Sequence, residues 1–195
     1  MTVDVYTIKI TYADCGGKIW RTAQIPPQYT LAEVGYMVQA AFGMLAEHLF
    51  EMSRKNKVWT FDAEDAEYLP EGMKHGYLTG QKFSTLRLKV GDTITMVYDM
   101  GSCHTFEIEV AAITPTAASK TASLPKITDG AGTDIIEDVP PAEIYEAIKR
   151  YEASGSTGLC EPFSGEEWKP KEWSAQELKG VLKSVIRRIK AAYED

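Results

Sequence analysis

The sequence has no long apolar run and no closely spaced cysteines. A membrane helix needs about 20 consecutive apolar residues, and no stretch of even about 18 occurs. The three cysteines, Cys15, Cys103 and Cys160, lie far apart and form no CxxC motif. These absences exclude a membrane-spanning helix and a disulfide scaffold, and they favour a protein of the reducing cytoplasm.

The sequence also has fewer basic than acidic residues. The 195 residues include 21 Lys and Arg against 28 Asp and Glu, which gives a net charge of −7 at pH 7. Proteins that bind nucleic acid normally carry a basic footprint. Direct nucleic-acid binding is therefore disfavoured, and we expect the partner to be a protein or a small ligand.

Alternating apolar and polar residues predict two β-hairpins. Residues 6–12 and 19–25 alternate with period two around a Gly-Gly turn, which is typical of two strands with one buried face each. Residues 93–99 and 105–113 are rich in β-formers and flank a second glycine-containing turn. Between the hairpins, Thr30 and Glu33 form a capping-box pattern that predicts the start of an amphipathic helix.

Two further helices are expected in the C-terminal part. Pro140-Pro141 opens one that runs to about residue 153. Ser174 and Glu177 form a second capping box before the last helix. That helix carries a continuous apolar stripe, which we interpret as core: Leu178, Val181, Leu182, Val185, Ile186 and Ile189. Its row of Lys179, Lys183 and Arg187 is interpreted as a solvated face rather than a nucleic-acid strip.

Together these elements predict an α+β fold. A mixed or antiparallel sheet from the two hairpins, with one packed helix, forms a ββαββ-type core, and helices follow at the C-terminus. We expect an α+β domain over residues 1–153. Residues 154–195 are predicted as a loop and amphipathic helix packed on the same domain. Residues 63–85 and 114–123 show no clear period and are predicted to be irregular, the second as an exposed flexible loop.

Three stretches carry a family resemblance: IWRTAQIPPQYTLAEVGYMVQAAFGMLAEHLFEM, VGDTITMVYDMGSCHTFEIEV and LPKITDGAGTDIIEDV. In this order and spacing they resemble the plasmid pRiA4b ORF-3-like family over about residues 5–150. The resemblance implies an α+β fold and a bacterial or archaeal, cytoplasmic protein, and it implies no particular reaction. Some relatives travel with insertion elements, so it also suggests an accessory role next to a mobile element.

The chain departs from the family pattern where relatives carry histidine, tryptophan or cysteine. Phe50 stands in place of a second His, and Met44 in place of a Trp. The hairpin has Ser102, His104 and Phe106 where relatives have Asp, Trp and His, and a cysteine before the Glu-Asp pair is missing. If relatives use those residues to bind a metal or to catalyse a reaction, this chain therefore lacks most of that set. We predict no catalytic residue, no bound metal and no cofactor.

The remaining polar and aromatic positions of the motifs define a candidate pocket: Trp20, Arg21, His48, Asp99, His104, Asp129, Glu137 and Asp138. Two interpretations compete. In the favoured one, the four carboxylates form a structural network with Arg21 through bidentate hydrogen bonds. In the other, they hold a cation or perform acid–base chemistry. Only three histidines are available and none has zinc-type spacing, and no nucleophile motif surrounds Cys103.

The functional expectation is an interaction or small-ligand-binding module of unspecified target. The alternative is a metal-dependent or hydrolytic enzyme that uses the candidate pocket, and we favour the non-enzymatic role. The enzyme hypothesis requires the polar side chains to converge in a concave site. The interaction hypothesis requires an exposed apolar patch or an uncovered sheet edge.

Overall fold

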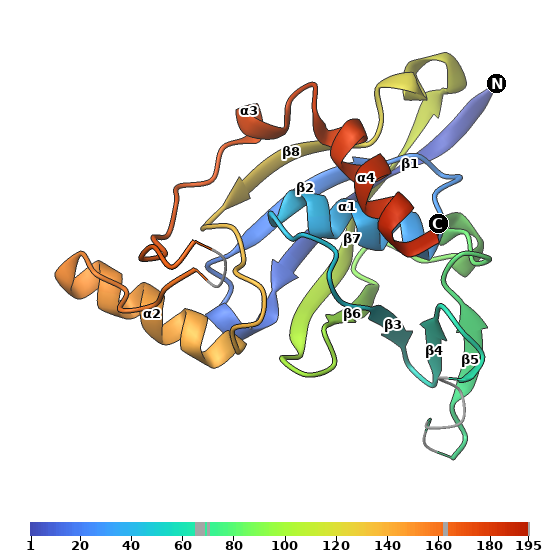
Figure 1. Ribbon diagram of the computed structural model, residues 1–195. Coiled ribbons are helices and arrows are strands. Elements are labelled where there is room, and N and C mark those ends of the chain that lie inside the picture. The colour runs from blue at the N-terminus through green and yellow to red at the C-terminus, as the bar shows by residue number, and fades with distance from the viewer. Residues whose placement is uncertain (65–68, 70, 162–163, 195) are drawn as a thin grey trace.

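The computed structural model describes residues 1–64, 69, 71–161 and 164–194. Its centre is an eight-stranded mixed sheet with the order β5-β4-β3-β6-β7-β1-β2-β8 (Figure 1). The strands are β1 (Thr2–Tyr12), β2 (Trp20–Ile25), β3 (Phe50–Arg54), β4 (Lys57–Thr60), β5 (Lys74–Tyr77), β6 (Thr93–Tyr98), β7 (His104–Ala117) and β8 (Lys126–Ala131).

The two predicted hairpins form the middle of this sheet. β1 pairs antiparallel with β2, and β6 pairs antiparallel with β7. The hairpins lie side by side because β1 also pairs with β7 along its full length, from Thr2 opposite Ala117 to Tyr12 opposite Phe106. β4 and β5 are parallel, which makes the sheet mixed. The α+β class and the two-hairpin core are confirmed.

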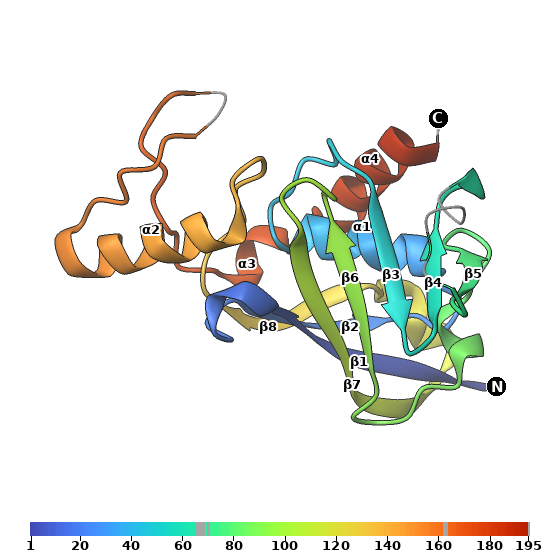
Figure 2. The ribbon, with the colours of Figure 1, turned by 90° about the horizontal axis from the view of Figure 1, so that it is seen from below.

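Helix α1 (Leu31–Ala41) begins at the predicted capping box. The Thr30 hydroxyl accepts from the Glu33 amide (3.2 Å), and the Thr30 amide donates to the Glu33 carboxylate (2.9 Å). Apart from Glu33, every residue of α1 is buried. Figures 1 and 2 show the reason, since the sheet bends around one side of α1 while α4 (Leu182–Glu194) covers the other. A helix buried on all sides needs apolar residues all round.

The predicted last helix is interrupted, which corrects the expectation of one continuous stripe. A short helix α3 (Ala175–Leu178) ends at Lys179, and Gly180 has a φ of +83° before α4 begins. Glycine takes this left-handed conformation at little cost, so the helix breaks here. Val181 leaves the stripe and is 45% exposed. The inward residues of α4 are core, as expected: Leu182, Ile186 and Ile189 are buried.

Several strands were not predicted from local sequence. The chain after α1 forms β3, residues 74–77 of the irregular segment form β5, and residues 126–131 form β8. The expected flexible loop over residues 114–123 is also wrong, because β7 continues to Ala117 and a 3₁₀ helix follows over Ala118–Ser123. Hydrogen bonding to other strands, of β3 to β4 and β6, of β5 to β4 and of β8 to β2, outweighs weak local patterning. Within residues 63–85, positions 65–68 and 70 lie outside the described residues.

Helix α2 (Pro141–Ser154) confirms the predicted helix over residues 141–153. It ends at Gly155, whose φ is +77°, and it lies beside the 3₁₀ turn η1 (Ala13–Cys15) that follows β1 (Figure 1). The division at residue 153 stays a prediction. No helix among the described residues combines the length and apolar character that a membrane span requires.

Candidate functional site

Three residues of the candidate pocket meet at one end of the sheet. His48 precedes β3, Asp99 follows β6, and Asp138 lies in the turn before α2. One ligand atom from each lies within 4.8 Å of the other two. His48 Nε2 is 2.8 Å from Asp138 Oδ1, and His48 Nδ1 is 3.8 Å from Asp99 Oδ1. We call these three residues the His48 cluster.

Both aspartates of the cluster occupy the left-handed backbone region. Asp99 has a φ of +57° and Asp138 a φ of +60°. Non-glycine residues adopt this conformation rarely, although Asp and Asn do so more readily than others. Asp99 is held there by its own turn, because its carboxylate accepts from the Gly101 amide (2.9 Å) and its carbonyl accepts from the Cys103 amide (2.6 Å). The turn therefore fixes where the Asp99 carboxylate lies.

The cluster is partly open to solvent and strongly anionic. The side chains of His48 and Asp138 are 32% and 44% exposed. Burial lowers the pKa of His48, but the hydrogen bond to Asp138 and the negative charges of Asp99, Asp138 and Glu137 outweigh it and raise that pKa. Burial raises the pKa of Asp99, but hydrogen bonds from Ser102 and Gly101 and the nearby His48 outweigh it and lower the pKa. The site thus favours cations.

Beneath the cluster, Tyr98 and Glu137 hold its segments in place. The Tyr98 hydroxyl donates to Glu137 Oε1 (2.8 Å) and accepts from the amides of Glu47 (3.1 Å) and His48 (3.2 Å). Glu137 Oε1 also accepts from the Leu45 amide (2.7 Å). The second oxygen of Glu137, Oε2, is buried and has no hydrogen-bond partner among the described residues.

Helix α4 supports the same segment from the other side. The Tyr193 hydroxyl contacts the His48 carbonyl oxygen and lies 3.1 Å from the Gln39 side-chain oxygen. Local sequence gave no signal for this support. A tyrosine near the end of the last helix reaches the site only because α4 packs on α1.

His104 lies close to the cluster without being part of it. It is fully buried, and its Nδ1 is 2.9 Å from the Tyr12 hydroxyl. Its Nε2 has no hydrogen-bond partner among the described residues. Burial lowers the pKa of His104, although the charges of Asp99, Asp14 and Asp138 act in the opposite direction. His104 is therefore held as a neutral imidazole.

Arg21 lies elsewhere, in a closed structural node. Its side chain is fully buried and stacks between the rings of Phe42 and Trp173, each 4.7 Å from the guanidinium carbon. Its five N–H groups all have acceptors: the carbonyl oxygens of Trp20, Ala41, Ala131 and Thr133, and the carboxylate of Asp134. A guanidinium offers five donors, so none is left for a ligand.

The other two candidates also lie away from the His48 cluster. Trp20 is half-buried on β2 beneath the Lys9 ammonium, 5.3 Å from its ring centre. Asp129 is exposed on β8, where its carboxylate accepts from the Gly130 amide. The structure thus separates the candidates into two groups. His48, Asp99, Glu137 and Asp138 lie together with His104 beside them, whereas Trp20, Arg21 and Asp129 lie along β2 and β8.

A pocket of about 230 Å³ adjoins Glu137. Apolar side chains of Leu45, Ile135 and Trp168 line it together with Lys169 and Lys171. The last three belong to the segment between α2 and α3, which sequence patterning did not connect to the candidate site.

Comparison with known proteins identifies the family and the fold. The model of the plasmid pRiA4b ORF-3-like protein family matches residues 4–177. Among solved structures, the chain is similar to the crystal structure of a protein of unknown function, MM3350, from Methanosarcina mazei Go1. The two share 22% identity with a TM-score of 0.67, over 89% of this chain and 96% of that one. A search of curated proteins finds no match.

Proposed function

We propose that this chain, which belongs to the plasmid pRiA4b ORF-3-like family, is a ligand-binding module whose ligand, contrary to the sequence-based prediction of no bound metal, is a divalent cation. The convergence of His48, Asp99 and Asp138 carries the proposal, since their ligand atoms lie within 4.8 Å of one another. The three residues come from three separate segments, so their approach results from folding and not from closeness in sequence.

The donor set fits a first-row divalent ion. One imidazole nitrogen and two carboxylate oxygens are ligands that Zn²⁺ accepts, and Mn²⁺ also binds carboxylates well. Mg²⁺ and Ca²⁺ prefer sites made of oxygen alone. Three protein ligands leave coordination positions open, and the partial exposure of His48 and Asp138 lets a ligand or solvent fill them.

The surroundings support binding rather than hydrolysis. Metal-assisted hydrolysis needs an open coordination position that faces a substrate pocket. The pocket next to Glu137 is lined by none of the three cluster residues. The buried Tyr98 hydroxyl and Glu137 Oε1 accept from backbone amides of the 45–48 segment and so position His48, while Glu137 also lines that pocket.

Isothermal titration calorimetry of the chelator-treated protein with Zn²⁺, and separately with Mn²⁺, tests the proposal. We expect one ion per chain and a matching rise in thermal stability. A ligand that binds only the folded state at one hundred times its Kd stabilises by about 2.7 kcal/mol. Asp138→Asn should weaken binding at least tenfold because it removes one anionic ligand.

Asp129→Asn is the matched control. It makes the same chemical change at an exposed aspartate on β8, which three strands separate from β6. It should leave cation affinity unchanged. Equal binding by wild type and Asp138→Asn, or no saturable binding by wild type, would overturn the proposal. A cytoplasmic location and a role beside a mobile element stay predictions.

A further inference from the structure

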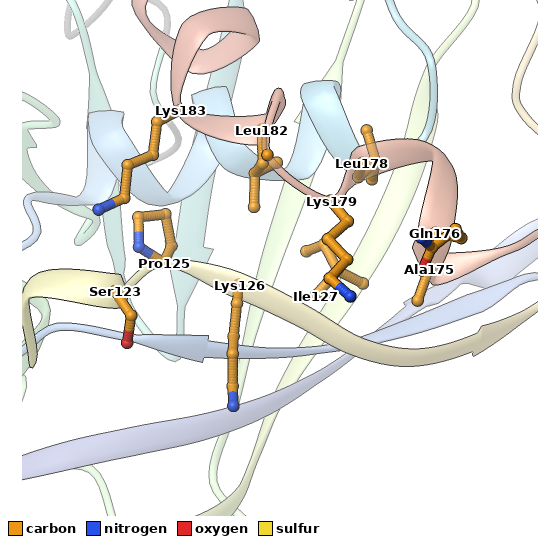
Figure 3. A pocket seen from close by; sticks show the side chains of 11 residues that line it. Ser123, Pro125, Lys126, Ile127, Ala175, Gln176, Leu178, Lys179, Leu182 and Lys183 are labelled. Atoms are coloured by element: carbon orange, nitrogen blue, oxygen red, sulfur yellow. The ribbon is translucent and has the colours of Figure 1, made fainter. Parts of the chain in front are cut away.

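A second cavity, of about 400 Å³, lies far from the His48 cluster, between β8 and the α3–α4 segment (Figure 3). Its apolar surface comes from Pro125 and Ile127 on the β8 side and from Leu178 and Leu182 on the helical side. Figure 3 shows Leu182 pointing from the start of α4 into the space above β8. We call this cavity the β8 groove.

The β8 groove is basic although the chain as a whole is acidic. Lys126, Lys179 and Lys183 line it, and none of the acidic side chains that the structure describes does. All three lysines are exposed. Lys183 bridges the groove by donating to the Ala122 carbonyl oxygen (2.5 Å). With a net charge of −7 on the chain, this local positive surface selects for an anionic partner.

A neighbouring cavity extends the groove along α4. It shares Pro125 and Lys183 with the first and adds Arg187 and Lys190. Lys183 and Arg187 are four residues apart on α4 and so lie on one face of it, whereas Lys179 precedes the break at Gly180. Glu33, which also lines this cavity, is engaged by Lys190 (3.9 Å) and by the α1 cap.

β8 is the edge strand of the sheet, and helix α3 contacts part of it. The sheet order ends at β8. Just beyond it, the Trp173 amide donates to the Gly132 carbonyl oxygen (3.0 Å), and the chain then turns away into α3. Among the described residues, no backbone hydrogen bond reaches Lys126–Ala131 from the outer side of the strand. An uncovered edge is a template for an added strand.

From the lysines, the apolar floor and the free edge, we infer that the β8 groove binds an extended acidic peptide segment of a partner protein. The peptide adds to the sheet beside β8, its carboxylates meet Lys179 and Lys183 on the helical side, and apolar side chains rest on the floor. Single-stranded nucleic acid shares the negative charge but stacks its bases on aromatic side chains. Among the described residues, no aromatic side chain lines the first cavity and a single one, Tyr29, lines the neighbouring cavity; one ring cannot stack successive bases, so the peptide is favoured.

Fluorescence anisotropy with a labelled eight-residue peptide of alternating glutamate and valine tests this inference. We expect saturable binding that weakens as salt rises, because exposed charges are screened. Lys179→Glu combined with Lys183→Glu should weaken binding at least tenfold. The matched control is Lys55→Glu with Lys89→Glu, which changes net charge equally at exposed lysines that line neither cavity; it should bind within about twofold of wild type.

Two further probes separate this mode from its competitors. The same peptide with alternate backbone amides N-methylated keeps its charges but cannot pair with β8, and it should lose at least tenfold in affinity. Equal binding of the methylated peptide would overturn strand addition. An eight-nucleotide oligothymidylate that binds more tightly than the peptide would overturn the choice of partner. Cation binding at the His48 cluster should be unaffected in the groove variants, so the two proposals fail independently.

Discussion

Two charged clusters of this protein, both drawn from the same candidate residues, have opposite characters. Arg21 is fully buried, and its five donors are all matched to acceptors. The His48 cluster is partly exposed, and the buried oxygen Oε2 of Glu137 beneath it has no partner among the described residues. A buried charge whose hydrogen-bonding groups are all paired stabilises the fold, whereas a polar group without a hydrogen-bond partner can still bind a ligand.

The partners of Arg21 show how a buried arginine comes to stabilise the fold instead of binding a ligand. Four of the five acceptors of Arg21 are backbone carbonyl oxygens, and the fifth is the carboxylate of Asp134 at 3.5 Å. Burial lowers the pKa of Arg21 to about 10, although Asp134 acts in the opposite direction. The side chain therefore stays protonated at neutral pH and joins β2, α1 and β8.

Replacing Arg21 should have the largest effect on stability. Arg21→Met leaves the acceptors unpaired in a closed site and removes the stacking partner of Phe42 and Trp173. Removing one partner of a buried charged network costs about 3–5 kcal/mol. Urea unfolding followed by circular dichroism measures this loss.

Lys18→Met is the control for this change. Lys18 forms an exposed pair with Glu152, so its replacement should leave the unfolding midpoint nearly unchanged. A midpoint for Arg21→Met that is as high as that of the control would show that the node contributes little.

Overpacking the space next to Arg21 should reduce stability less than replacing Arg21 itself. A Cβ added to Gly130 would lie 2.8 Å from Arg21 Cδ and 2.9 Å from the Trp173 ring. Gly130→Ala should destabilise by about 1–3 kcal/mol, the usual cost of overpacking. Gly80→Ala is the matched control, since a Cβ there comes no closer than 3.9 Å to another group. Equal unfolding free energies for the two variants would contradict close packing around the guanidinium.

Sequence patterns predicted the parts of this molecule that depend on neighbouring residues. The capping box of α1 and the two hairpins are local, and both are confirmed. The partners of Arg21 were not predictable, because carbonyl oxygens carry no side-chain signal and become close only after β2 pairs with β8. β8 was missed for the same reason, since pairing with the distant strand β2 stabilises it.

Sequence motifs predicted which residues are candidates for the site, but not which of those residues lie close together. The motifs contained His48, Asp99 and Asp138, yet only the fold separates them from Trp20, Arg21 and Asp129. Asp134, the actual carboxylate partner of Arg21, was left out of the candidate pocket.

The pH dependence of stability should differ between His48 and His104. The raised pKa of His48 means that its contribution is fully present below about pH 6.5 and is lost as pH rises through the folded-state pKa. The lowered pKa of His104 means the reverse, since its contribution is present above about pH 6.5 and is lost as pH falls. In chelator, His48→Gln should therefore cost more stability at pH 5.5 than at pH 8.5.

Urea titrations of wild type and His48→Gln at both pH values measure this difference. We expect it to be smaller than the cost of Gly130→Ala, because His48 is about one-third exposed and solvent screens its ion pairs. A loss that is the same at both pH values would show that the carboxylates do not favour the protonated imidazole.

Asp138→Asn should have the smallest effect on stability. For that reason it best tests the difference between the His48 cluster, which binds a ligand, and Arg21, which stabilises the fold. Asn tolerates the left-handed backbone of residue 138 as well as Asp does. The side chain is also 44% exposed, so the unfolding free energy should change by no more than about 0.5 kcal/mol. If Zn²⁺ affinity nevertheless falls at least tenfold, the residue contributes to binding and not to folding, which is the opposite of Arg21. A loss of stability comparable to that of Gly130→Ala would instead place Asp138 with the structural node.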